Sequence, residues 1–178
     1  MLFRSPGWTQ TTSIFAGQGE GVDLSYDGSA VIVQWVSYGL TYRLGSTGYV
    51  PEGTLSNFDS YGVSYRRVAI SRDGKIAAVG NESDVAAGLG PIFPPYQTAD
   101  HESGGVVIYE RKSNGTWALR RAIKPGSTNN GLFGHSVALG DNGRLLVVGA
   151  PGDRSKAMGI DGDRNDNSVA WRGAVWIY

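Results

Sequence analysis

The residues that best suit chemistry are acids and amides near the C-terminus, spaced like metal ligands. They read Asp161-Gly162-Asp163-Arg164-Asn165-Asp166-Asn167, and Asp153 stands at the start of the same segment. Alternating Asp and Asn side chains on one tight loop turn oxygen atoms toward a common point, and a hard cation such as calcium takes oxygen ligands. The candidate ligands of a structural calcium ion are therefore Asp153, Asp161, Asp163, Asn165 and Asp166.

This acidic segment also has a plainer interpretation. An Asp- and Asn-rich loop is stabilised without any ion when its side chains accept hydrogen bonds from nearby backbone N–H groups. The segment is not an EF-hand loop, because Asp166 replaces the glycine of the sixth position and Arg172 the glutamate of the twelfth. The sequence leaves both interpretations open.

Four further residues are candidates for surface contacts or modification. Trp171 and Arg172 lie in a segment expected to be a loop, so we expect an exposed ligand contact there. Asn81-Glu82-Ser83 and Asn114-Gly115-Thr116 are N-glycosylation sequons, and both fall in segments predicted as loops or turns. Asn81 and Asn114 would carry glycans only in a chain exported from a eukaryotic cell, and chance occurrence is the alternative.

Histidine occurs twice, at His101 and His135. His101 lies between Asp100 and Glu102, but a catalytic pair needs a nucleophile held on a base, which this sequence does not show. His135 is expected at the edge of a strand. We therefore predict a protein that is not an enzyme.

The elements that must position these residues are marked by three copies of one phrase. Residues 21–28, 67–74 and 136–143 share Val, any residue, Leu or Ile, two more residues, then Asp or Asn, then Gly. Val and Leu or Ile two apart lie on one face of a strand, and Asp-Gly or Asn-Gly supplies the positive φ of a tight turn. An apolar run follows each copy, as in a strand buried on both faces. The phrase predicts three equivalent β-hairpins.

Third and fourth strands extend these hairpins. Residues 104–109 and 173–178 have similar sequences and follow copies two and three at the same distance, while residues 39–44 stand closer behind copy one. Fourth strands are predicted over 116–123 and 49–52. Trp117 and Trp176 alternate with apolar neighbours and are expected to pack between such units.

Four-stranded antiparallel units repeated at this length are typical of β-propeller blades. The predicted fold class is therefore all-β, a partial β-propeller with about two and a half to three four-stranded antiparallel blades. We expect blade-like units over residues 18–57, 58–126 and 127–178. Because the last residues read as the middle of a strand, we expect a fragment of one propeller domain.

The third copy resembles the FG-GAP repeat, the blade unit of integrin α-subunits and integrin-like proteins. The resemblance rests on Phe133-Gly134-His135-Ser136-Val137-Ala138-Leu139 with Val148-Gly149-Ala150-Pro151, and on the acidic segment leading to Gly173. Copy two is weaker, with Tyr61-Gly62 displaced upstream, and copy one keeps only the hairpin. The resemblance implies a propeller and a structural calcium ion, although FG-GAP calcium loops usually connect other strands. A WD-repeat propeller is the nearest alternative.

Composition narrows the function classes. Lys plus Arg equal Asp plus Glu at 16 each, so a broad electrostatic grip on nucleic acid is not expected. The chain has no cysteine, which excludes disulfides and cysteine nucleophiles, and it has no apolar run long enough for a membrane helix.

The function expected from these patterns is a non-enzymatic scaffold or adhesion module, extracellular or at the cell surface. Its inter-strand loops would contact a protein or glycan partner, with a possible structural calcium ion. A structural subunit of a surface filament, which would self-assemble through its blades, is one alternative. A glycan-acting enzyme on a propeller scaffold is another.

Overall fold

The computed structural model describes residues 13–14, 21–35, 38–56, 66–82, 104–125, 131–163 and 166–178. Every regular element in these ranges is a strand, so the predicted all-β class is confirmed. In chain order the strands are β1 (Val22–Leu24), β2 (Ala30–Gln34), β3 (Tyr38–Gly45), β4 (Gly48–Ser56), β5 (Arg66–Ile70), β6 (Ile76–Asn81), β7 (Gly105–Arg111), β8 (Trp117–Ile123), β9 (Ser136–Leu139), β10 (Leu146–Ala150) and β11 (Ala174–Ile177).

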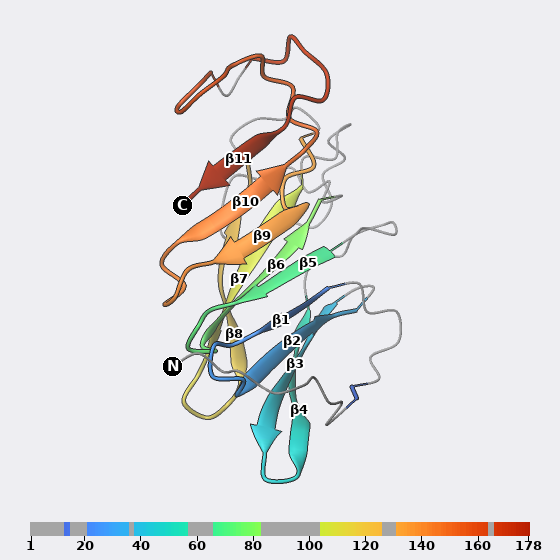
Figure 1. The fold of residues 1–178 in the computed structure, drawn as a ribbon, viewed down its shortest axis with the longest axis vertical. Coiled ribbons are helices and arrows are strands. Elements are labelled where there is room, and N and C mark those ends of the chain that lie inside the picture. Colours follow the sequence, from blue (N-terminus) through green and yellow to red (C-terminus); the bar gives the residue numbers. More distant parts are fainter. Residues whose placement is uncertain are drawn as a thin grey trace, which may run out of the picture.

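The strands form three antiparallel sheets in simple meander order. Sheet one is β1-β2-β3-β4, sheet two is β5-β6-β7-β8, and sheet three is β9-β10-β11. Figure 1 shows the sheets stacked along the long axis of the molecule, with sheet one at the bottom and sheet three at the top. Each sheet thus begins with one copy of the repeated phrase, as the sequence predicts.

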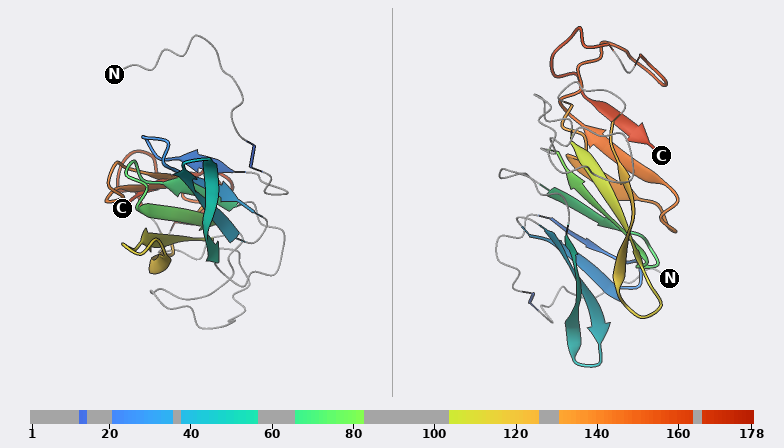
Figure 2. Two further views of the ribbon diagram at one scale, coloured as in Figure 1. Left: turned by 90° about the horizontal axis from the view of Figure 1, so that it is seen from below. Right: turned by 180° about the vertical axis from the view of Figure 1, so that it is seen from behind.

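The three sheets are related as consecutive blades of a propeller. Their first strands lie side by side, β1 against β5 and β5 against β9, and the view from behind shows the same succession (Figure 2). The chain therefore forms part of a propeller-like β fold.

Two apolar clusters fill the spaces between neighbouring sheets. The first joins sheets one and two through residues such as Ile32, Leu55 and Val79, with Trp117 packed against it. The second joins sheets two and three through Val106, Phe133 and Val148, with Trp176 against it. Both tryptophans thus pack between sheets, as predicted. The buried apolar area of these clusters provides the main attraction between the sheets.

The hairpin of each copy is closed by the same turn. Gly28, Gly74 and Gly143 have φ angles of 71°, 67° and 65°, a region that glycine adopts without steric cost. In the first two copies a buried serine, Ser25 or Ser71, accepts a hydrogen bond at 2.9 Å from the N–H that opens the next strand. The third copy has Gly140 at this position and lacks that bond.

The second strands differ in burial according to their neighbours. Every residue of β6 is buried, because sheet two has a sheet on each side. In β10 buried residues alternate with half-buried ones. One face of sheet three packs on sheet two, while exposed Val175 and Ile177 lie on its other face.

The outer strands carry a feature that the sequence analysis missed. Thr41 pairs with Gly53 and Tyr42 with Pro51, so Glu52 is an extra residue in β4 and forms a β-bulge. Arg120 is the corresponding extra residue in β8. A bulge re-aims the side chain that it carries.

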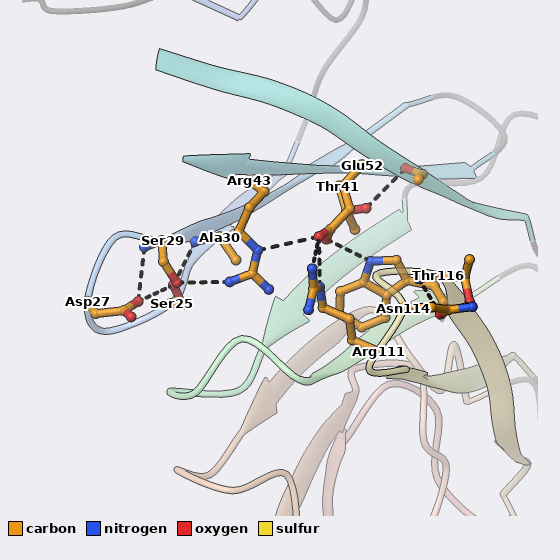
Figure 3. A network of polar contacts seen from close by, with 12 residues as sticks. Ser25, Asp27, Ser29, Ala30, Thr41, Arg43, Glu52, Arg111, Asn114 and Thr116 are labelled. Carbon is orange, nitrogen blue, oxygen red and sulfur yellow. Dashed lines mark hydrogen bonds and ion pairs between the residues drawn. The ribbon is translucent and has the colours of Figure 1, made fainter. Parts of the chain in front are cut away.

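Glu52 uses its position to link the first two sheets (Figure 3). Its carboxylate accepts hydrogen bonds from Arg111 of β7, at 2.7 Å from Nε, and from Trp117 Nε1 of β8, at 3.2 Å. Arg43 of β3 adds a weaker contact at 3.4 Å. The carboxylate is therefore a polar clamp between sheets one and two.

Candidate binding site

Most of the predicted functional residues lie in the connection between β10 and β11, residues 151–173, which the structure describes except at 164–165. Figure 1 shows it in orange and red beyond the end of sheet three. Its two ends are tied together, because the Asp153 carbonyl accepts the backbone N–H groups of Arg172 and Gly173 at 3.0 and 3.1 Å. Asp153 itself is buried.

Side-chain hydrogen bonds hold the interior of this connection. The Asp166 carboxylate accepts the N–H groups of Lys156 and Ser168 at 3.1 and 2.9 Å, and Ser155 Oγ donates to the Asp163 carbonyl at 2.9 Å. Hydrogen bonds from Ser168, followed by that from Lys156, lower the pKa of Asp166 below its ordinary value. Internal polar contacts therefore fix the shape of the connection.

The predicted calcium ligands are spread over this framework. Asp153 Oδ1 accepts the Ser155 N–H at 3.0 Å, Asp166 is bonded as above, and Asp161 and Asp163 are exposed. Asn165 lies outside the described residues. Within the described ranges no group of three or more His, Asp or Glu side chains is placed to hold a metal ion. Calcium binding therefore stays a prediction, and Asp153 and Asp166 would have to rearrange to provide it.

Three large apolar side chains of the connection face solvent. Met158, Ile160 and Trp171 are 87%, 94% and 72% exposed. Trp171 also has a φ of 57°, a left-handed conformation that costs a bulky residue free energy. The exposure expected for Trp171 is confirmed, while Met158 and Ile160 were missed because neither belongs to a binding motif.

Arg172, the next residue, lines a shallow groove at the end of sheet three. The groove has a volume of about 420 Å³ and is lined by residues 135–136, 149–151 and 172–175. His135, at its rim, is hydrogen-bonded through Nδ1 to the buried carboxylate of Glu82, the residue that follows β6. His101 lies outside the described residues.

The two predicted glycosylation sites differ in accessibility. Asn81 is not in a loop as predicted: it is the last residue of β6 and is fully buried between sheets. An enzyme that attaches a glycan needs an accessible side chain, so burial opposes modification at Asn81 in the folded chain. Asn114 is exposed in the turn before β8, where its Oδ1 accepts the N–H and hydroxyl of Thr116.

Comparison with known proteins supports the fold and nothing finer. No known protein family matches the sequence, and no curated protein is similar to it. A crystal structure of a protein from Lactobacillus plantarum matches 90% of this chain with a TM-score of 0.50 at 12% sequence identity. The chain spans 45% of the length of that protein. At this identity the match shows similarity of fold alone.

The described residues contain no helix with the length and apolar character needed to cross a lipid bilayer.

Proposed function

We propose that the chain is a non-enzymatic adhesion-type module that binds a protein partner outside the cell through the β10–β11 connection. The observation that carries this proposal is the solvent exposure of Met158, Ile160 and Trp171 on one internally bonded segment. Several large apolar side chains exposed on one surface segment are typical of protein contacts, and tryptophan is enriched among the residues that dominate binding energy.

The mechanism of binding is preorganisation. The hydrogen bonds to Asp153 and Asp166 already fix the connection, so less conformational entropy is lost when a partner binds. The resemblance of sheet three to the FG-GAP repeat agrees with this role, because that resemblance implies an integrin-like propeller. A protein partner is favoured over a glycan because Met158 and Ile160 lack the flat ring that stacks on a sugar.

The test measures binding of the purified chain to immobilised fibronectin, laminin and collagen and, separately, to a glycan array. We expect binding to at least one protein, and an affinity at least about tenfold lower for Trp171→Ala, equivalent to about 1.4 kcal/mol. Leu119→Ala, at an exposed leucine on β8, is the matched control and should bind like the parent. Failure to bind any protein, or equal affinity of the Trp171 variant, would overturn the proposal, and binding to glycans alone would replace it.

Calcium is proposed as a structural ion of the same connection, held by Asp153, Asp161, Asp163, Asn165 and Asp166. A cation bound only to the folded chain raises its thermal stability by mass action. We therefore expect calcium to raise the melting temperature of the parent, and Asp161→Ala combined with Asp163→Ala to remove that increase. Differential scanning calorimetry with calcium and with a chelator is the measurement. Identical melting of parent and variant under both conditions would reject the ion.

A further inference from the structure

Sheet three has an uncovered face whose counterpart in sheet two is an interface. Val106 and Val175 are equivalent, because they pair with Gly80 and Gly149 in corresponding places of the two sheets. Val106 is fully buried against sheet three, whereas Val175 is 69% exposed. The same contrast holds for Ile108 and Ile177. In the described residues, the face of sheet three that corresponds to the contact face of sheet two therefore has no sheet packed on it.

The groove beside this face also has a counterpart in the interface between sheets two and three. Gly80 and Gly104 of sheet two lie directly beneath Phe133-Gly134, so that an added Cβ would overlap the backbone of that pair. Gly149 and Gly173 hold the equivalent positions in sheet three and line the 420 Å³ groove. On sheet two, the equivalent place is filled by Phe133-Gly134, the segment that leads into sheet three. The groove on sheet three is therefore where the corresponding segment of a following blade would lie.

Sheet one presents the complementary surface at the other end. Val68 and Ile70 of β5 pack toward sheet one, and Val137 and Leu139 of β9 pack toward sheet two. Val22 and Leu24 occupy the same positions of the phrase in β1, where they are 70% and 51% exposed. These two side chains are therefore placed to pack on a preceding blade that the described structure does not contain.

We propose that these open faces bind each other in a second copy of the chain, with sheet three of each copy packed on sheet one of the other. The contact would continue the arrangement that relates sheets one, two and three, and each contact joins two different surfaces, with a two-fold axis relating the pair of contacts. Two copies provide two such contacts and close into a ring of six blades.

Sedimentation equilibrium of the full chain at micromolar concentrations tests the ring. We expect twice the monomer mass of 18.9 kDa. Val22→Asp with Leu24→Asp alters only the face of sheet one, and Val175→Asp with Ile177→Asp only that of sheet three. Both double variants change exposed positions, and circular dichroism should show them folded. Each should sediment as a monomer, and Leu119→Asp, the control, as a dimer.

Mixing the two double variants distinguishes a contact of sheet three with sheet one from a contact between two identical faces. Each mixed pair keeps one unaltered sheet three facing one unaltered sheet one, so an equimolar mixture should regain a dimer, weaker than that of the parent. A monomeric parent, an open polymer, or a dimer that survives either double variant would overturn the proposal. A mixture that stays monomeric would do the same. None of these outcomes bears on the partner site at Trp171.

Discussion

At the scale of single residues, the carboxylate of Glu52 is a partly buried acceptor for side chains of a neighbouring sheet. Replacing Glu52 with Ala leaves Arg111 and Trp117 without the acceptor that they share across two sheets. We expect a loss of about 2–3 kcal/mol in the free energy of unfolding, because partly buried donors lose a charged partner. Urea denaturation measures it. The control Glu110→Ala removes a solvent-screened ion pair with Lys112 and should cost much less stability than Glu52→Ala.

The same residue predicts how stability depends on pH. Burial acts to raise the pKa of Glu52, but hydrogen bonds from Arg111 and Trp117 and the charges of Arg111 and Arg43 lower the pKa overall. A lowered folded-state pKa means that the contribution is complete above the ordinary glutamate pKa of about 4.3 and is lost as the pH falls below it. The free energy of unfolding should therefore decrease as the pH is lowered from about 4.

Glu52→Gln should weaken this acid dependence without abolishing it. Asp27 contributes in a lower window, because hydrogen bonds from Ser29 and Ser25 lower its pKa to about 2. Urea denaturation of parent and variant between pH 3 and pH 7 is the measurement. An unchanged pH profile in the Gln variant would show that Glu52 is not the responsible group.

The sequence could indicate candidate residues from their types, but it could not predict which residues contact one another. Trp171 was predicted to be exposed because an aromatic residue followed by arginine stood outside any strand pattern. The Glu52–Arg111 and Glu82–His135 pairs join residues more than fifty positions apart, and a single sequence carries no signal for such pairs. Asn81 was misplaced because its sequon marks a chemical acceptor and says nothing about burial.

At the scale of elements, the turn of each repeated phrase predicts the effect of one hydroxyl group. Ser71 is fully buried, and its Oγ accepts the Ile76 N–H and donates to Asp73 at 2.7 Å. Ser71→Ala leaves that N–H without its side-chain acceptor and should cost about 1–3 kcal/mol in urea denaturation. Ser113→Ala, in an exposed turn, should cost less than about 0.5 kcal/mol. Equal losses would mean that the turn hydroxyl does not stabilise the hairpin.

The strands and hairpins were predictable because their signals are local. The Val-x-Leu spacing, the turn glycine and the apolar run each act within a few residues, so all three hairpins could be predicted. The fourth strand of sheet one runs from Gly48 to Ser56, longer than the predicted 49–52. Its extension depends on pairing across a bulge at Glu52, and such pairing is set by the neighbouring strand.

At the scale of the whole molecule, stability is distributed over interfaces between consecutive sheets. Sheet two contacts sheets one and three through separate apolar clusters. When each unit contacts only its neighbours, a defect in one interface acts mainly on the units that it joins. The sequence could indicate blades but not which faces are covered, because equivalent residues such as Ile108 and Ile177 have the same side chain and opposite exposure.

Phe133→Ala tests this separation of interfaces. Phe133 is fully buried and packs edge-on against Trp176 and Tyr178, at centroid distances of 6.1 and 6.2 Å. Its truncation should cost about 3–5 kcal/mol, because it leaves a cavity between sheets two and three. Hydrogen exchange should then accelerate in β9, β10 and β11 while β2 and β3 keep their protection, since the cluster around Ile32 does not include Phe133. Uniform acceleration in all three sheets would show that the chain unfolds as one cooperative unit. The loss of stability at one interface would then extend to the other interface as well.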